Sequence, residues 1–235
     1  MKGKNILLGS VAAFGMSAMS HGQLIDIALG NGTTNPVGAA VLGNSGDIWN
    51  VFDASFGSFG PFAVSDVAGH WTGASVSVLC DGGTAALNTP SQPLPDLTHC
   101  YAFDNTGGWI ALEVEGLAAN QKYNLVLYVA SDDAAEGDRS VAGTVFGASN
   151  VAFTATGNPE SSFVNGENVV DLNVVSNSHG AVTILEGDGT QNTSGEVDLS
   201  GLQIKPAAVP EPATLGILAI GIVSLIARRR RKKSS

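Results

Sequence analysis

The sequence predicts an all-β protein whose body, residues 23–206, is a single β-sandwich. In this region apolar and polar residues alternate with a period of two, which is the spacing of a half-buried strand. Clusters of Gly, Asn, Asp and Ser separate the alternating runs, and no run of twelve residues or more shows a clear helical period. Many short strands with turn signals between them are typical of sandwiches and barrels.

Nine segments of the body have strand character. They are Leu24–Leu29, Ser75–Cys80, Trp109–Glu115, Tyr123–Val129, Val141–Phe146, Val151–Thr156, Asn168–Val174, Ala181–Leu185 and Val197–Ile204. A short Gly-containing connection separates Trp109–Glu115 from Tyr123–Val129, so we expect these two to be neighbouring antiparallel strands. No repeat of fixed period is visible, which argues against a propeller or a solenoid.

Charge is distributed unevenly along the 235 residues, whose formal net charge is −10. The body holds 20 of the 21 carboxylates against only Lys122, Arg139 and Lys205, and the two ends of the chain are basic. A body this acidic excludes nucleic acid as a partner, because nucleic-acid binding needs a basic face.

Residues 1–22 have the layout of a signal peptide. Lys2 and Lys4 precede the apolar stretch Ile6–Met19, and small residues then allow cleavage before His21 or Gln23. We therefore expect delivery to the Sec export machinery. The alternative is an N-terminal amphipathic or buried helix.

Residues 207–235 combine three different segments. Pro210-Glu211-Pro212 cannot continue a helix or a strand ladder, so it stays extended and accessible. The apolar run 213–227 would span about 22 Å as a helix, against about 30 Å for a hydrocarbon core. A basic tail, residues 228–233, then fixes its orientation with the body outside the cytoplasm. These features predict a short transmembrane helix; a plain tail anchor or a surface helix is the alternative.

This tail resembles the PEP-CTERM sorting signal of Gram-negative bacteria. The residues that carry the resemblance are Val209, Pro210, Glu211, Pro212, the apolar run, and Arg228, Arg229, Arg230 and Arg231. The resemblance implies recognition by an exosortase in the inner membrane, removal of the tail, and transfer of the body to the cell surface or extracellular matrix. It also implies that Pro210, Glu211 and Pro212 are recognition residues of a substrate and have no catalytic role.

Cys80 and Cys100 are the only cysteines of the chain. An even pair in an exported protein predicts a disulfide, which in the loop-entropy model would add roughly 3 kcal/mol of stability. Two buried free thiols are the alternative.

Acidic residues gather in two expected loops. One loop holds Asp132, Asp133, Glu136 and Asp138, and the other holds Glu186 and Asp188 on either side of a glycine. Calcium takes six to eight oxygens from loops of this kind, so we expect the first loop to bind calcium. The alternative is that both loops are ordinary solvated turns.

Signatures of catalysis are missing from the body. It contains no His-Glu-x-x-His, no Gly-x-Ser-x-Gly and no phosphate-binding glycine loop. Glu113 and Glu115 lie on one side of a predicted strand and indicate a solvated sheet face. Trp49, Trp71 and Trp109 are candidates for a sugar-stacking platform or for core positions.

The body is also similar to jelly-roll modules of the galactose-binding-like type. The similarity rests on Trp49-Asn50, on Gly116-Leu117 followed by Tyr123-Asn124-Leu125 and Tyr128, and on the closing segment 199–204. It implies a jelly-roll-like sandwich and does not by itself establish sugar binding.

The sequence therefore predicts an exported, non-enzymatic protein of the cell surface or extracellular matrix with a structural or adhesive role. The expected partners are the Sec export machinery, an exosortase and, transiently, the inner membrane. Binding of exopolysaccharide by the sandwich is the alternative function, and hydrolysis is a third.

Overall fold

The computed structural model describes residues 23–30, 40–52, 58–80, 82–86, 97, 100–104, 108–129, 140–157, 162–188 and 196–207. The predicted signal peptide and the sorting segment from residue 208 onward, with Pro210, Glu211, Pro212 and the arginine cluster, lie outside these ranges. Over the described ranges, no helix is both long enough and apolar enough to cross a membrane.

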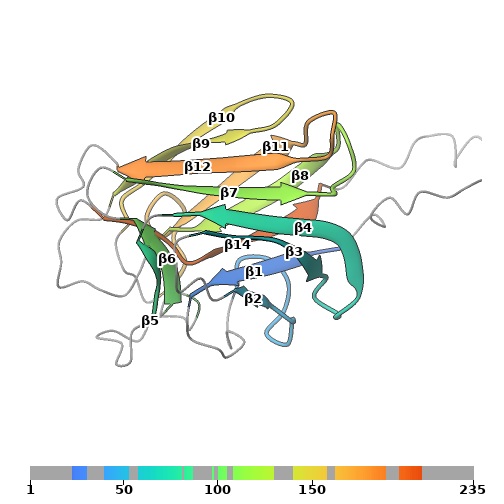
Figure 1. The fold of residues 1–235 in the computed structure, drawn as a ribbon, viewed down its shortest axis with the longest axis horizontal. Helices are drawn as coiled ribbons and strands as arrows, with labels where there is room; N and C mark the ends of the chain where they lie inside the picture. Colours follow the sequence, from blue (N-terminus) through green and yellow to red (C-terminus); the bar gives the residue numbers. More distant parts are fainter. Residues whose placement is uncertain are drawn as a thin grey trace, which may run out of the picture.

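The described residues form a β-sandwich, as the sequence predicts (Figure 1). Sheet A has the strand order β11-β8-β14-β1-β2, and sheet B has the order β10-β9-β12-β7-β4-β3. A third, small sheet, C, has the order β13-β6-β5. Apart from the parallel pair β1–β2, all neighbouring strands within the sheets are antiparallel.

The bounds of the strands are as follows. Sheet A contains β1 (Ile25–Leu29), β2 (Asn50–Phe52), β8 (Lys122–Tyr128), β11 (Val169–Val175) and β14 (Gly201–Pro206). Sheet B contains β3 (Ser58–Ser65), β4 (Trp71–Leu79), β7 (Trp109–Glu115), β9 (Val141–Phe146), β10 (Val151–Ala155) and β12 (Val182–Asp188). Sheet C contains β5 (Gly83–Ala86), β6 (Cys100–Asp104) and β13 (Val197–Leu199).

The main core fills the space between sheets A and B. Each strand contributes every second side chain, because successive side chains of a strand point to opposite faces. The largest fully buried members are Ile25, Ile27 and Leu29 of β1, Ile110 and Leu112 of β7, Tyr123, Leu125 and Leu127 of β8, Ile184 of β12, Leu199 of β13 and Leu202 of β14. The period-two pattern of the sequence is therefore the pattern of this core.

One expected strand pairing is wrong. The strands β7 and β8 do not pair: β7 lies between β4 and β12 in sheet B, whereas β8 lies between β11 and β14 in sheet A. The connection between them, residues 116–121, crosses from one sheet to the other. Both strands turn an apolar face to the same core, and that shared pattern cannot distinguish pairing within a sheet from packing between sheets.

The outer face of sheet A is covered by a second apolar cluster and a polar network. Trp49 packs edge-on against Tyr128, with ring centroids 6.1 Å apart. The Tyr128 hydroxyl donates to Gln203 Oε1 at 2.6 Å, and Gln203 Nε2 donates to Asp26 Oδ1 at 3.0 Å and to the carbonyl of Leu42 at 2.9 Å. Gln203 thereby joins β1, β8 and the segment 40–49 through one side chain.

Asn50 joins the two large sheets. Its Nδ2 donates to the carbonyl of Asp26 on β1 at 2.9 Å and to the carbonyl of Ser65 on β3 at 2.8 Å, and its Oδ1 accepts from the Ser65 amide at 2.8 Å. The Trp49-Asn50 pair noted in the sequence therefore has a structural role at the edge of the sandwich.

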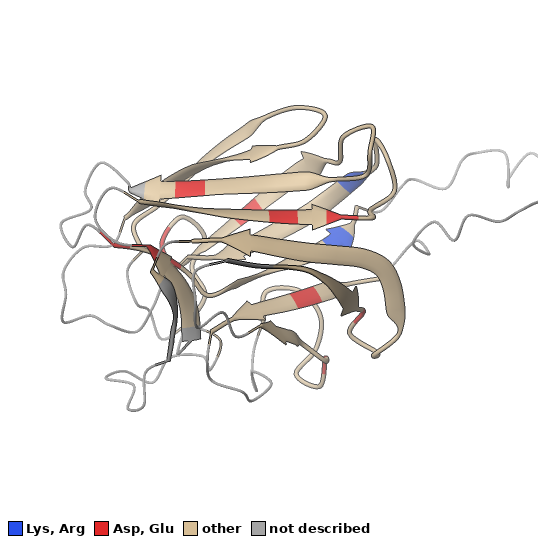
Figure 2. Cartoon of the chain, viewed as in Figure 1, with Lys and Arg blue, Asp and Glu red and all other residues tan. Residues whose placement is uncertain are grey.

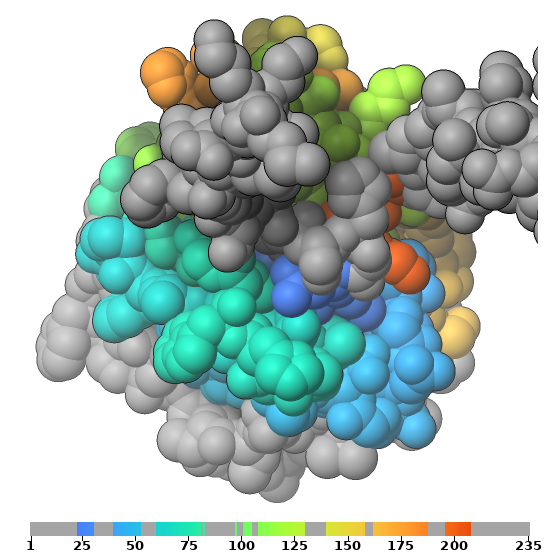
Figure 3. All heavy atoms as spheres, turned by 90° about the vertical axis from the view of Figure 1, so that its right-hand side faces the viewer, coloured from blue at the N-terminus to red at the C-terminus, as the bar shows by residue number. Residues whose placement is uncertain are grey.

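The sandwich has two distinct ends. Ile25 pairs with Ile204, so β1 starts where β14 finishes; we call this the terminal end. Lys122, the first residue of β8, also lies here, because its carbonyl accepts from the Ala207 amide at 2.9 Å. The opposite, distal end is where β7 begins and β12 finishes, since Trp109 pairs with Gly187. In Figure 1 the terminal end, where β1 starts and β14 finishes, is on the right, and Figure 3 looks onto that side.

Asp26 is a buried carboxyl that favours its protonated form. Burial, opposed by the Gln203 hydrogen bond and assisted by the charge of Asp47, raises the pKa of Asp26 to about 7. Its Oδ2 accepts no hydrogen bond from the described part of the chain. Because the folded state binds this proton more tightly than the unfolded chain, stability is highest below the usual pKa of an aspartate and falls as the pH rises toward 7.

We predict that Asp26→Asn removes this loss. Over the window from about pH 4 to pH 7, the free energy of unfolding of the wild type should fall, relative to that of the variant, by up to about 1.4 kcal/mol per pH unit. Urea unfolding across this pH range measures the difference. Parallel pH profiles for the two proteins would contradict the assignment.

Candidate functional site

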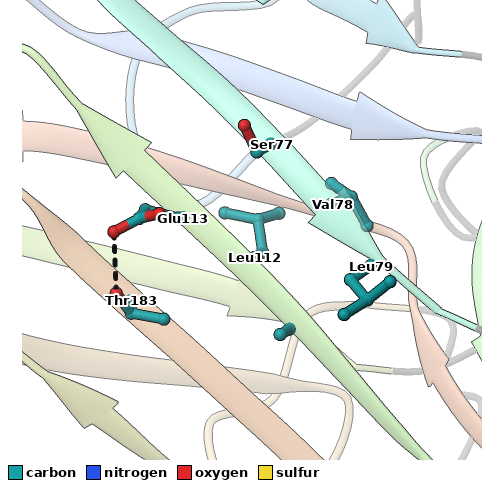
Figure 4. Close-up of a pocket in the computed structure, with 7 residues that line it drawn as sticks. Ser77, Val78, Leu79, Leu112, Glu113 and Thr183 are labelled. Carbon is teal, nitrogen blue, oxygen red and sulfur yellow. Dashed lines mark hydrogen bonds between the residues drawn. The ribbon is translucent and has the colours of Figure 1, made fainter. Parts of the chain in front are cut away.

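A shallow depression of about 220 Å³ lies on the outer face of sheet B, across β4, β7 and β12 (Figure 4). The burial pattern of these strands sends every second side chain to this face. The lining residues are Ser77, Val78 and Leu79 of β4, Ala111, Leu112 and Glu113 of β7, and Thr183 of β12. We call this depression the sheet B groove.

A polar row crosses the groove. Ser77 pairs in register with Glu113, and Glu113 pairs with Thr183. The Thr183 hydroxyl donates to Glu113 Oε1 at 3.3 Å, as the dashed line in Figure 4 shows. Two hydroxyls and one carboxylate are a set that can donate to and accept from a neutral, hydroxyl-rich ligand.

An apolar row runs beside the polar one, one step nearer the distal end. Leu79, Ala111 and Leu185 are register partners across β4, β7 and β12, and both leucines are exposed. Trp109, 46% exposed, follows on the same face of β7. This face therefore places an aromatic ring and two aliphatic side chains next to hydrogen-bonding groups, which is the composition of many small-ligand sites.

The three tryptophans do not form one platform. Trp49 is 7% exposed and belongs to the apolar cluster on the outer face of sheet A. Trp71 is 74% exposed, but it begins β4 at the terminal end, whereas Trp109 begins the antiparallel β7 at the distal end. Only Trp109 lies on the same face as the groove and close to it.

Glu113 and Glu115 point outward from β7, as expected for a solvated sheet face. Glu113 is half-buried in the groove and Glu115 is exposed. A catalytic pair needs two carboxylates placed on opposite sides of a reacting bond. Among the described residues that line the groove, Glu113 is the one carboxylate.

The expected second acidic loop is wrong. Glu186 belongs to the longer strand β12, pairs with Ile110 and Gly143, and points into the core, where it is fully buried. Burial, and then the charge of Asp198, raise the pKa of Glu186 well above its usual value. Among the residues that the structure describes, neither carboxylate oxygen of Glu186 has a hydrogen-bond partner. The sequence did not reveal this because Glu186 looks like the polar start of a turn.

The expected calcium ligands Asp132, Asp133, Glu136 and Asp138 lie outside the described residues, so this site stays a prediction. Within the described residues, no group of three or more His, Cys, Asp or Glu side chains is placed to hold a metal ion.

The expected disulfide also stays a prediction. Cys80 directly follows β4 and is buried in the main core. Cys100 begins β6, where its backbone pairs with Ala86, and its side chain lies outside the described atoms.

Sequence reasoning missed most of the groove. Ser77, Leu79 and Thr183 are ordinary outward residues of alternating strands, and nothing in their local sequence indicates that three strands bring them together. The signal that could have found them is the pair of exposed leucines at positions where polar residues are expected.

Comparison with known proteins identifies the C-terminal segment. Residues 208–232 match the PEP-CTERM protein-sorting motif. The chain carries a PEP-CTERM sorting signal. No curated protein matches the chain by sequence.

Three solved structures are similar to part of the chain. CBM35 from Cellvibrio japonicus Abf62 is 14% identical, with 48% of this chain and 76% of that chain covered and a TM-score of 0.29. The CBM36-1 domain of a multidomain xylanase from the hindgut metagenome of Trinervitermes trinervoides is 13% identical, with 67% and 97% covered and a TM-score of 0.31. TmCBM61 in complex with β-1,4-galactotriose is 10% identical, with 56% and 76% covered and a TM-score of 0.24. At these TM-scores the likeness carries no conclusion about the fold or the function of this chain.

We predict that Glu186 carries a proton in the folded protein at neutral pH, because ionising it beside Asp198 in the core is costly. Glu186→Gln should therefore be tolerated at pH 5 and should make the protein more stable than the wild type at pH 9. Thermal melting at the two pH values measures this. Glu113→Gln, which changes an outward carboxylate on the same sheet, is the control and should show no such crossover.

Proposed function

We propose that this protein is exported as a precursor, anchored in the inner membrane by its PEP-CTERM sorting signal, and released by an exosortase so that the β-sandwich is displayed at the cell surface or in the extracellular matrix. Its role there is structural or adhesive, and it is not an enzyme.

The observation that carries this proposal is the position of the sorting motif relative to the fold. The sandwich ends with β14 at Pro206, and Ala207 still makes a backbone hydrogen bond to Lys122. The matched motif begins at residue 208. A cut within the motif therefore removes no strand, and the released body keeps its complete core.

We predict that replacing Pro210 and Pro212 with alanine leaves the full-length precursor in the inner membrane. Alanine permits a helix to extend upstream through the recognition segment, which proline prevents. Cell fractionation followed by intact-mass measurement reports the result. Pro36→Ala, a change in the body, is the matched control and should be processed normally. Normal release of a shortened body from the variant with both prolines replaced would contradict the proposal.

The sheet B groove favours a second candidate, the binding of a neutral exopolysaccharide. An exposed indole and aliphatic side chains can contact the apolar face of a sugar ring, and Ser77, Glu113 and Thr183 can exchange hydrogen bonds with its hydroxyls. The single carboxylate in the lining makes a strongly anionic polymer a poor ligand.

If the groove binds a glycan, Trp109→Ala should weaken binding by about tenfold or more, which corresponds to about 1.4 kcal/mol. Trp71→Ala is a well-matched control because Trp71 is also exposed but lies at the other end of the sandwich. A glycan array with the full chain finds the ligand, and calorimetry measures the two variants. Equal losses for both variants would exclude the groove as the binding site.

A further inference from the structure

We propose that the terminal end of the sandwich is a membrane-facing surface. In the anchored precursor, Trp71 and Ile48 enter the headgroup layer of an anionic phospholipid bilayer, and Lys122 and Lys205 contact its phosphates. The inference rests on the proposed function, which places the apolar run of the tail in the membrane.

The tail keeps this end of the body close to the bilayer. The apolar run 213–227 starts seven residues beyond Pro206, and seven extended residues reach at most about 25 Å. The run itself is short for a hydrocarbon core of about 30 Å, and a short span draws its flanking residues toward the membrane. Because β1 begins beside the end of β14, residues 23 and 24, which precede β1, lie at the same end of the sandwich.

Trp71 is an exposed indole on a firmly held turn. Asp66 Oδ1 accepts from the backbone amides of Ala68 at 3.0 Å and His70 at 2.9 Å, which fixes the turn directly before β4. Thr72, the next residue, donates to the carbonyl of Val64 at 2.7 Å. Trp71 is 74% exposed, and tryptophan is enriched where a membrane meets water.

Ile48 lies beside this turn and extends the apolar surface. Its amide donates to the carbonyl of Val67 at 3.0 Å, and the Val67 amide donates to the carbonyl of Leu24 at 3.0 Å. Ile48 is 43% exposed. These bonds tie the turn and Ile48 to the residue that precedes β1, where the chain enters the sandwich. In Figure 3 the segments around β4 and residues 40–52 form one continuous face beside β1 and β14.

The cations of the described residues gather at the same end. Lys122 and Lys205 are the only lysines or arginines in the described ranges, and both are exposed, as the two blue segments of Figure 2 show. Two carboxylates also lie toward this end: Asp66 is nearly buried and faces His70 at 3.5 Å, and Asp47 accepts from the Asn44 amide at 2.7 Å. The exposed carboxylate of Glu115 lies on the outer face of sheet B. Two exposed lysines and an exposed indole at this end are side chains suited to lipid phosphates and to the boundary between membrane and water.

Fluorescence quenching by brominated lipid tests the inference. The full chain is reconstituted into vesicles of phosphatidylcholine and phosphatidylglycerol with and without brominated acyl chains, and wild type, Trp71→Phe and Trp109→Phe are compared. We expect quenching in the wild type, loss of most of it in Trp71→Phe, and full retention in Trp109→Phe, because Trp109 lies at the distal end. Lys122→Glu with Lys205→Glu should reduce the quenching only in vesicles that contain phosphatidylglycerol.

Flotation of the same vesicles separates the two proposals. If the chain floats with the vesicles but Trp71 is not quenched, or Trp109 is quenched equally, the membrane-facing surface is wrong while the anchored tail stands. If the chain does not float, the proposal of an anchored precursor is wrong, and the proposal of a membrane-facing surface, which depends on it, is wrong too. Circular dichroism of each variant checks that the sandwich is intact. Because the vesicles contain no protein other than this chain, quenching there identifies lipid, and not the exosortase, as the contact.

Discussion

The central position of β14 is the constraint on which the rest of the structure depends. This last strand lies between β1 and β8. Sheet A is therefore in two separate parts until β14, which ends at Pro206, pairs with both of these strands. Gln203, at the middle of the strand, then bonds to Asp26, Tyr128 and Leu42 and fastens the covering segment to the sheet. Non-local pairing of this kind closes late in folding.

The same strand gives the molecule its polarity. Because β14 ends beside the start of β1, one end of the sandwich receives both termini and the other is free of them. The exposed Trp71 and the two lysines lie at the terminal end, whereas Trp109 and the buried carboxyl of Glu186 lie at or near the distal end. A membrane-anchored body would thus present the distal end and the outer face of sheet B to its surroundings. The groove would be usable before and after removal of the tail.

Much of this fold could be predicted from the sequence, because period-two alternation is a local consequence of burying one face of a strand. Strands β7 and β9 have the expected bounds, and most of the others shift by a few residues. Which strands pair with each other was harder to predict from the sequence, because β7 and β8 follow each other closely yet belong to different sheets. Strands β2 and β5 were missed because they are short, and β3 because its Gly60-Pro61 interrupts the alternation. Strand β6 was also missed, and the expected strand Val197–Ile204 is divided into β13 of sheet C and β14 of sheet A. The groove was not predicted for a related reason: its residues come from three strands and become neighbours only through the register of strand pairing.

The buried carboxyls show how an acidic exported body can retain a stable core. Asp26 is buried on the outer face of sheet A and Glu186 in the core beneath sheet B, and burial raises the pKa of each. A protonated carboxyl costs far less to bury than a carboxylate, and it takes one unit out of the self-repulsion of a strongly negative body. The exposed carboxylates keep the released protein soluble, whereas these two contribute to packing. Acidity at the surface and protonation in the interior are thus separate consequences of where each side chain lies in the sandwich.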